Sequence, residues 1–133
     1  VWAVKVLGGD GSGRWSDVIC GLNWVYQNRD TIDVVNMSLA GPGEDSAACA
    51  GGMYAAICKI DAEGIPVVVA AGNADRRGPV DVSKRKPAAY DEVITVAAYA
   101  DSNGLSGGGG PRTCDRSDDD RVWPWSNFGE GVD

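Results

Sequence analysis

Apolar and polar positions alternate in blocks along this chain. Short runs of small or β-branched apolar residues predict strands at residues 1–7, 33–39, 66–71 and 92–99. Between them, apolar residues at helical spacing predict helices at residues 16–28 and 53–63. This order is typical of a parallel sheet joined by right-handed crossovers. The sequence therefore predicts an α/β fold with three layers, a mostly parallel sheet between helices on both faces.

The ends and faces of the helices can also be predicted. Ser16 is expected to cap the first helix, because a serine hydroxyl accepts a hydrogen bond from an N–H of the first turn. Gly64 is expected to end the second helix, since glycine adopts the left-handed conformation that follows many helices. Cys20 is assigned to the buried side of the first helix as a small apolar residue. The other residues expected on that side are Val18, Ile19, Leu22, Val25 and Tyr26.

Polar and glycine-rich residues follow the last predicted strand. Residues 101–120 predict a long surface loop, and residues 122–129 predict short strands or a hairpin. The loop contains Asp115 and a run of aspartates, Asp118, Asp119 and Asp120. They form either a solvated acidic loop or oxygen ligands for a hard cation such as calcium, although their spacing matches no calcium-loop template.

Length and charge restrict the classes of protein. A chain of 133 residues is one domain at most. Its net charge of −7 argues against nucleic-acid binding, which requires clustered Lys and Arg. No apolar run approaches the ~20 residues of a membrane-spanning helix, so we expect no membrane association. The chain begins inside a predicted strand, without the pattern of a signal peptide, which indicates a fragment.

The cysteines leave two alternatives open. No zinc-site spacing is present among Cys20, Cys49, Cys58 and Cys114, and the sequence has no histidine, so no metal site is expected. On one straight helix, Cys49 and Cys58 would lie about 13.5 Å apart, too far for a disulfide. Gly51 and Gly52 would let Cys49 fold back, so a disulfide and two thiols both remain open. Cys114 is either a free thiol or has a partner outside this chain.

Two loops follow predicted strands and would lie at the carboxyl edge of the sheet, where open parallel sheets bind ligands. Residues 8–14 are glycine-rich, but Arg14 and Trp15 stand where nucleotide-binding motifs require Gly or Lys-Ser/Thr. We interpret this loop as a turn that can lie beside an extended ligand. Residues 38–41 are small and leave backbone groups accessible to an added peptide strand, or they form a plain turn.

A third loop begins at Gly72 and Asn73, directly after residues 66–71. Gly72 allows close backbone approach, and the Asn73 carboxamide has two N–H donors. Such a donor stabilises the oxyanion that forms in the transition state of acyl transfer. On residue type alone, a simple turn residue is the better explanation of Asn73.

In order and at this spacing, these segments resemble the middle of the catalytic domain of subtilisin-like serine proteases, the subtilases. The resemblance lies in AVKVLGGDGSGRWSDVICGLNWV, DVVNMSLAGP, GIPVVVAAGN, PAAYDEVITVAAYADSNG and WSNFGEGVD. It covers nearly the whole chain, and VNMSL and VVAAGN are its most specific parts. It implies a partial subtilisin-like fold, with residues 1–133 as the central part of the domain.

The resemblance also implies roles for the three loops. Asn73 would be the side-chain donor of the oxyanion hole. One wall of the pocket for the residue before the cleaved bond would come from Ser38, Leu39 and Ala40, and the other from Ala70, Ala71 and Gly72. More distant substrate subsites would be bordered by Gly9, Gly11, Gly13 and Gly41.

The catalytic Asp, His and Ser of the family have no matching positions here. Without histidine, a Ser/His/Asp mechanism lacks its general base. We therefore expect a fragment of a secreted serine endopeptidase that contacts a peptide or protein substrate but does not hydrolyse it alone. The alternative is a non-catalytic peptide-binding or interaction module with the same fold. Surfaces exposed by truncation predict self-association. No cofactor is expected, and calcium stays open for the parent protein.

Overall fold

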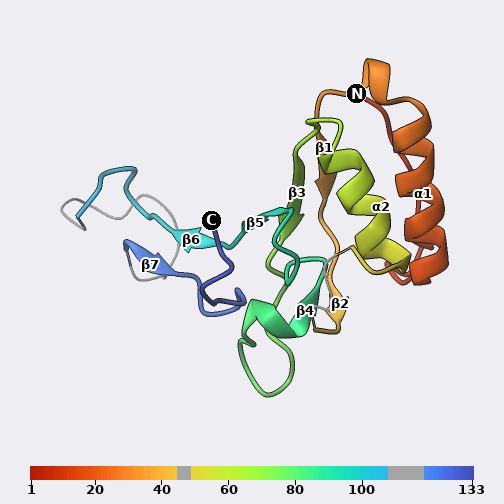
Figure 1. Ribbon diagram of the computed structural model, residues 1–133. Helices are drawn as coiled ribbons and strands as arrows, with labels where there is room; N and C mark the ends of the chain where they lie inside the picture. Colours follow the sequence, from red (N-terminus) through yellow and green to blue (C-terminus); the bar gives the residue numbers. More distant parts are fainter. Residues whose placement is uncertain (45–48, 108–118) are drawn as a thin grey trace.

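The structure is a computed structural model that describes residues 1–44, 49–107 and 119–133 (Figure 1). The predictions made for Cys114, Asp115 and Asp118 lie outside these residues. The helices are α1 (Trp15–Gln27) and α2 (Gly52–Asp61), with short 3-10 turns η1 (Arg29–Thr31) and η2 (Val82–Lys84). The strands are β1 (Val35–Met37), β2 (Gly41–Pro42), β3 (Val67–Ala70), β4 (Arg85–Lys86), β5 (Ile94–Val96), β6 (Tyr99–Ala100) and β7 (Arg121–Val122).

A parallel sheet of β1, β3 and β5 organises the fold, with β3 in the centre. Val69 of β3 pairs with Met37 on one side and with Thr95 on the other. Val67 and Val69 are each 1% exposed. Apolar strands of this kind are typical of parallel sheets. The predicted α/β class and the parallel sheet are therefore confirmed.

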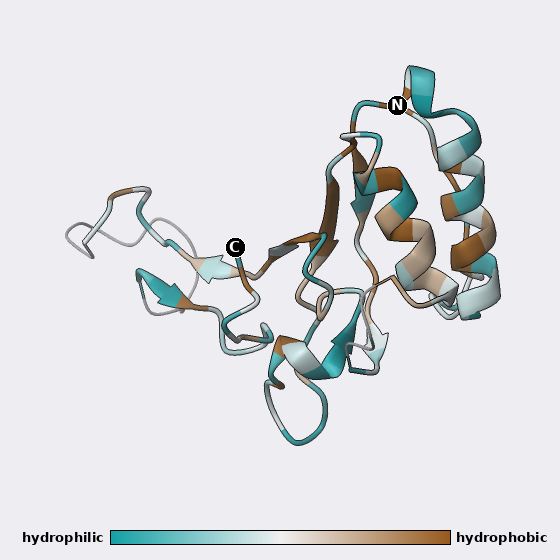
Figure 2. Ribbon diagram, viewed as in Figure 1, coloured by the Kyte–Doolittle hydropathy of each residue, from teal (hydrophilic) through white to brown (hydrophobic). Residues whose placement is uncertain are grey.

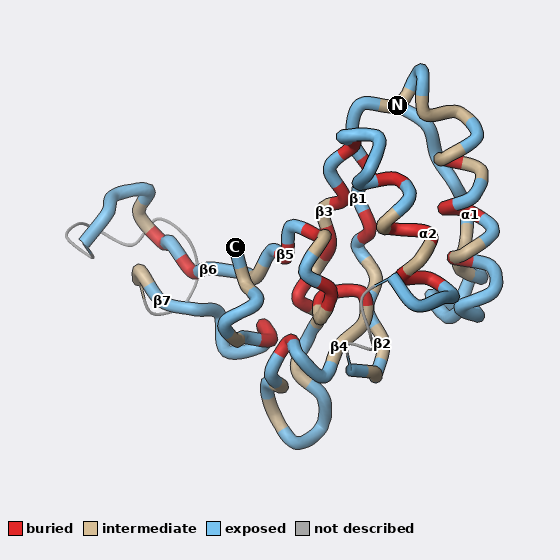
Figure 3. Tube along the Cα trace, viewed as in Figure 1, coloured by how far each residue is buried: buried red, intermediate tan, exposed pale blue. Residues whose placement is uncertain are grey.

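Both described helices lie on the same side of β1 and β3, and α1 packs on α2 (Figure 1). The prediction placed helices on both faces of the sheet, whereas in the described part of the chain both helices cover one face (Figure 1). Hydrophobic residues follow β1 and β3 and the facing sides of the helices (Figure 2). Buried residues gather between these strands and the helices, whereas the antiparallel pair of β6 and β7 is largely exposed (Figure 3). In α2, Ile57 and Ile60 are each 0% exposed. The core thus lies between the sheet and the two helices.

Residues 1–7 are extended but form no strand, which corrects the prediction for this segment. The segment packs on α1 instead. A Cβ added at Gly21 would lie 2.7 Å from Cγ1 of Val6, and the ring centroids of Trp2 and Trp24 are 5.7 Å apart. A strand requires hydrogen bonds to a neighbouring strand, and none of the described residues supplies them here.

Two predictions for α1 were wrong. The helix begins at Trp15 with Arg14 as its N-cap, so Ser16 lies inside the helix and does not cap it. Cys20 is exposed and free. The buried positions of α1 are Val18, Gly21, Leu22 and Val25. Because the helix has 3.6 residues per turn, Cys20 points away from the side that these four residues define.

A disulfide joins Cys49 and Cys58, which decides between the two alternatives. Gly51 and Gly52 both have positive φ, 146° and 58°, and turn the chain just before α2. This turn brings Cys49 back against α2. The Cα atoms of Cys49 and Cys58 therefore lie 5.9 Å apart. At the other end of α2, Gly64 has φ of 75° and stops the helix as predicted.

The remaining strands form two small antiparallel pairs. β2 pairs with β4, and β6 pairs with β7. The predicted strand 92–99 is thus divided into β5 and the start of β6. Pairing of Val122 with Tyr99 confirms short strands in the last apolar segment. Neither α1 nor α2 is long and apolar enough to cross a membrane.

Candidate active site

The carboxyl ends of β1 and β3 meet at one edge of the sheet, because the two strands are parallel. Residues 38–41 leave the sheet after β1, and Ala71, Gly72 and Asn73 leave it after β3. These two loops touch, since a Cβ added at Gly72 would lie 2.9 Å from the Cβ of Ala40. The structure therefore brings together two of the three loops that the sequence singled out.

Gly72 turns the chain at the end of β3 with φ of 81°. Only glycine adopts this conformation without strain, and Ala40 leaves no room for a side chain. Asn73 follows as an exposed residue. Within the described part of the chain, no hydrogen bond occupies its carboxamide. Its two N–H donors are therefore available to a ligand at this edge.

The backbone on both sides of Asn73 is held by the segment 125–127. The N–H of Ala74 donates to the carbonyl oxygen of Trp125 at 2.8 Å. The N–H of Asn127 donates to the carbonyl oxygen of Gly72 at 3.1 Å. Between these bonds, Asn73 and Ser126 form an antiparallel bridge. The main chain of Asn73 is thus held in place, while none of the described residues forms a hydrogen bond with its side chain.

The glycine-rich loop reaches the same region through α1. Gly9 and Gly11 are exposed, and a Cβ added at either would meet nothing within 4 Å. Gly13 leads into α1, whose first residue, Trp15, packs on Gly41: an added Cβ there would lie 2.5 Å from Cζ2 of the indole. The Gly9 to Gly13 loop is therefore linked to residues 38–41 by the Trp15 ring.

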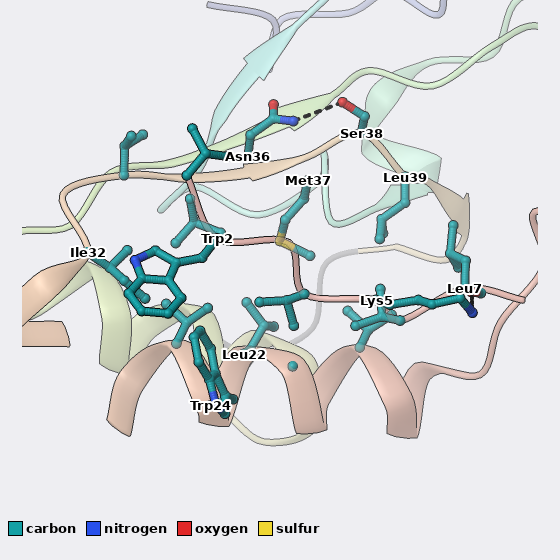
Figure 4. A pocket seen from close by; sticks show the side chains of 18 of the residues that line it. Trp2, Lys5, Leu7, Leu22, Trp24, Ile32, Asn36, Met37, Ser38 and Leu39 are labelled. Atoms are coloured by element: carbon teal, nitrogen blue, oxygen red, sulfur yellow. Dashed lines mark hydrogen bonds between the residues drawn. The ribbon is translucent and has the colours of Figure 1, made fainter. Parts of the chain in front are cut away.

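A cavity of about 800 Å³ lies between residues 1–7, α1 and β1. In Figure 4, Met37 and Leu39 point into it, whereas Asn36 and Ser38 are directed to the other side of the strand. Nδ2 of Asn36 donates to Oγ of Ser38 at 3.0 Å. Leu39 therefore lines this mainly apolar cavity, and the side chains of Ser38 and Leu39 face opposite ways.

The residues predicted for the other wall differ in accessibility. Ala71 is 1% exposed and belongs to the core, so its side chain does not reach the edge. Ala70 is half-buried and pairs with Val96 of β5. Gly72 is half-buried beside Ala40. Only Ala70 and Gly72 can therefore present surface there.

A parallel sheet with polar loops at its carboxyl edge is shared by many α/β proteins, so the family must come from comparison. The sequence model of the subtilase family matches residues 1–133. This chain belongs to the subtilase family. The match includes all three loops, which confirms the resemblance from which their roles were inferred.

Relatives of this chain include subtilisins and subtilisin-like proteases. It is 43% identical over 103 residues to subtilisin DY of Bacillus licheniformis, covering 77% of this chain and 34% of subtilisin DY. It is 45% identical over 97 residues to Subtilisin-like protease 2 of Pseudogymnoascus destructans, covering 72% and 22% of the two chains. A solved structure of a cold adapted subtilisin-like serine proteinase aligns with a TM-score of 0.67 and 28% identity, covering 96% of this chain and 37% of that one. The chain thus spans between 22% and 37% of these relatives' lengths.

Sequence reasoning did not single out two residues that support the loop after β3, Ser126 and Asn127. They are 4% and 0% exposed. Nδ2 of Asn127 donates to the carbonyl oxygen of Ala71 at 2.9 Å, and Oγ of Ser126 accepts from the N–H of Ala98, also at 2.9 Å. Two adjacent polar residues within the apolar segment 122–129 were the available signal. Their partners lie 56 and 28 residues away along the chain, which no local pattern reveals.

Charged groups near β4 are stabilised in their ionised forms. Nζ of Lys84 lies 2.6 Å from Oε1 of Glu44, and this hydrogen bond lowers the pKa of Glu44 and raises the pKa of Lys84. At the start of η2, the backbone N–H of Ser83 donates to Oδ1 of Asp81 at 2.9 Å and lowers the pKa of Asp81. All three groups around η2 and β4 are therefore favoured in their charged forms.

Three carboxylates of the long loop come together. Oxygens of Asp101, Asp119 and Asp120 lie within 4.8 Å of one another, and carboxylate oxygens are the ligand type that a hard cation such as calcium prefers. Asp119 also accepts hydrogen bonds from the N–H of Ser102 at 2.8 Å and from Nδ2 of Asn103. These bonds give Asp119 a structural role in anchoring the loop.

A second group contains Cys49, Cys58 and Glu92. Metal ions bind cysteine as the thiolate, and the two sulfurs here are joined in the disulfide. In the disulfide form, this group therefore offers a metal ion no thiolate ligand.

Proposed function

We propose that this chain carries the oxyanion donor and part of the substrate cleft of a subtilisin-like serine endopeptidase. The observation that carries the proposal is the turn at Gly72, which packs against Ala40 and is followed directly by the exposed Asn73. In acyl transfer, negative charge develops on the carbonyl oxygen of the scissile bond. A donor held in position stabilises that charge without reorganisation in the transition state. Asn73 meets this requirement because its backbone is fixed on both sides.

The proposed substrate is a peptide or protein in extended conformation. Support comes from the glycine-rich loop, since Gly9 and Gly11 are exposed and leave the backbone open to a neighbouring chain. An extended peptide would pair with the backbone of residues 38–41 as an added strand. Ala70 and Gly72 would then contact the residue that precedes the cleaved bond.

The general base and nucleophile would come from chain beyond these residues. A Ser/His/Asp mechanism needs histidine to take the proton of the serine, and this sequence has none. The relatives have long stretches that the chain does not match, in which a triad would be located. The chain alone should therefore not hydrolyse peptides. We also propose a secreted protein, supported by the Cys49–Cys58 disulfide, because disulfides persist in oxidising compartments.

The test uses the full-length endopeptidase that this proposal implies, assayed with a chromogenic peptide. In subtilisin itself, removing one side-chain oxyanion donor lowers kcat by about 10²–10³-fold, and this known value sets the expectation. Asn73→Ala should lower kcat to that extent and leave KM nearly unchanged. Asn23→Ala, at an exposed position of α1, is the matched control and should retain full activity. Equal activity of the two variants would reject Asn73 as the oxyanion donor.

The absence of histidine favours a second candidate, a non-catalytic peptide-binding or interaction module. Reading the source gene through both ends of this segment separates the two. Family-like motifs with Asp and His before Val1 and Ser after Asp133 would support the endopeptidase. Unrelated sequence or stop codons would support the module, for which peptide binding without hydrolysis is expected.

We further propose that the chain by itself associates with other copies. The edge strand β5 has exposed apolar residues, Ile94 (44%) and Val96 (50%), and Trp125 is 64% exposed. Open sheet edges and apolar patches favour association. Light scattering at micromolar concentration should give a mass above the monomer, and Ile94→Lys should reduce it. A monomeric wild-type chain would contradict the proposal.

A further inference from the structure

Asn127 lies at the base of the loop that follows β3. Its side chain is 0% exposed, unusual for asparagine. Nδ2 donates to the carbonyl oxygen of Ala71 at 2.9 Å, and Oδ1 accepts from the N–H of Val80 at 3.0 Å. The backbone N–H of Asn127 also donates to Gly72. One residue therefore ties together both ends of the loop between Gly72 and Val80, which contains Asn73.

The orientation of this carboxamide follows from its partners. A carbonyl oxygen can only accept and a backbone N–H can only donate, so Nδ2 must face Ala71 and Oδ1 must face Val80. The side chain also contacts the turn directly, because a Cβ added at Gly72 would lie 3.0 Å from Nδ2. Asn127 thus contacts the main chain immediately before Asn73.

Ser126 holds Asn127 in turn. Its hydroxyl donates to the carbonyl oxygen of Asn127 at 3.1 Å and accepts from the N–H of Ala98, which follows β5. The N–H of Phe128 donates to the carbonyl oxygen of Val80 at 3.3 Å. The segment around Asn127 is therefore attached both to the loop and to the end of β5.

We propose that Asn127 is a positioning residue for Asn73. Its carboxamide fixes the carbonyl of Ala71 and the N–H of Val80 at the base of the loop, and the Gly72 turn then directs the Asn73 donors. The inference rests on the proposed function of Asn73, since a positioned donor matters for the rate only if Asn73 contacts the oxyanion. Buried polar groups that lose their partner are costly, so a change at Asn127 shifts the turn itself.

Asn127→Asp is the most specific substitution, because it keeps the size of the side chain and removes its N–H donor. In Asn127→Asp, an ionised carboxylate oxygen would face the carbonyl oxygen of Ala71 and repel it. Protonation restores an O–H donor, and burial favours the protonated form. The defect should therefore diminish as the pH is lowered from 8 to about 5. A role in filling space alone predicts no such recovery.

The first experiment is NMR of this chain with ¹⁵N-labelled side-chain amides. In the unaltered protein, the Asn127 NH₂ should exchange at least about 100-fold more slowly than the exposed Asn73 NH₂. In Asn127→Asp at pH 8, the Asn73 NH₂ and Gly72 N–H signals should shift or broaden. Ile60→Val, which perturbs the buried core of α2, is the control and should leave both signals in place.

Two outcomes would overturn the inference. One is fast exchange of the Asn127 NH₂ in the unaltered chain, a measurement that does not depend on any variant folding. The other is a folded Asn127→Asp chain with unchanged Asn73 and Gly72 signals.

A second experiment measures kinetics in the full-length endopeptidase that the proposed function implies. Misplacement of a catalytic group by about 1 Å can cost 10²-fold, so Asn127→Asp should lower kcat by about 10–100-fold at pH 8 with KM nearly unchanged. Lower pH should narrow the gap to the unaltered enzyme. If Asn73→Ala has no effect on kcat, the oxyanion proposal fails, while the NMR arm still decides whether Asn127 positions Asn73. If Asn73→Ala lowers kcat but Asn127→Asp does not, only the positioning role of Asn127 is rejected.

Discussion

Replacing Gly72 by alanine should destabilise the fold through two separate effects. The first is conformational, because Gly72 has φ of 81° and an L-residue in this region costs about 1–2 kcal/mol. The second is steric. The new Cβ would lie 2.9 Å from the Cβ of Ala40 and 3.0 Å from Nδ2 of Asn127, and crowding of this kind costs about 1–3 kcal/mol. Together, the free energy of unfolding should fall by about 2–5 kcal/mol.

Gly64 offers a control that separates the two effects. Its φ is 75°, close to that of Gly72, but a Cβ added there would meet nothing within 4 Å. Gly64→Ala should therefore show the conformational cost alone, about 1–2 kcal/mol. The difference between the variants, about 1–3 kcal/mol, measures how tightly the loops after β1 and β3 pack together.

Urea unfolding followed by tryptophan fluorescence measures both variants. With a slope of about 1–3 kcal/mol per molar urea, the steric effect should lower the midpoint of Gly72→Ala by about 1 M relative to Gly64→Ala. If the two midpoints coincide and the slopes are equal, the close approach of Ala40 and Gly72 is wrong. The loops after β1 and β3 would then not pack against each other at one edge of the sheet.

Four further predictions, three from substitutions and one from chemical labelling, test other parts of the fold. Cys49→Ser with Cys58→Ser should lower the free energy of unfolding by about 2.6 kcal/mol, since the bridged cysteines are 9 residues apart; a thermal melt checks this by a fall in Tm under non-reducing conditions. Ile57→Ala should cost about 2–5 kcal/mol in urea unfolding, because Ile57 is 0% exposed, and a value below 1 would contradict its burial. Because the pKa of Asp81 is lowered in the folded state, its ionised carboxylate stabilises the fold above about pH 4, and this contribution is lost as the pH falls below that range. On acidification, the free energy of unfolding should therefore fall less for Asp81→Asn than for the unaltered chain. Cys20, being exposed and free, should react with iodoacetamide in the native protein, as peptide mapping would show.

Local pattern was enough where an element depends on neighbouring residues. The apolar run that became β3 ends at Gly72, and α2 stops before Gly64, because both glycines take positive φ that other residues avoid. The alternation of strands and helices likewise predicted the parallel sheet. The Cys49–Cys58 bridge was permitted by Gly51 and Gly52, although the sequence left it open.

Local pattern was insufficient where a residue depends on distant partners. Residues 1–7 have the composition of a strand but lack a paired neighbour among the described residues. Cys20 has the character of a buried residue, yet the packing of α1 leaves it exposed. Ala71 was expected at the edge and lies in the core instead.

The sequence by itself determined the fold class, the family resemblance and the Asn73 turn, because these depend on residue order and on conformations that only certain residues adopt. Tertiary structure alone decided that Ala40 meets Gly72 and that Asn127 supports the turn from 56 residues away. Hydrogen bonds and close contacts between distant segments form only when the whole chain packs, and buried polar groups must then find partners wherever the fold supplies them.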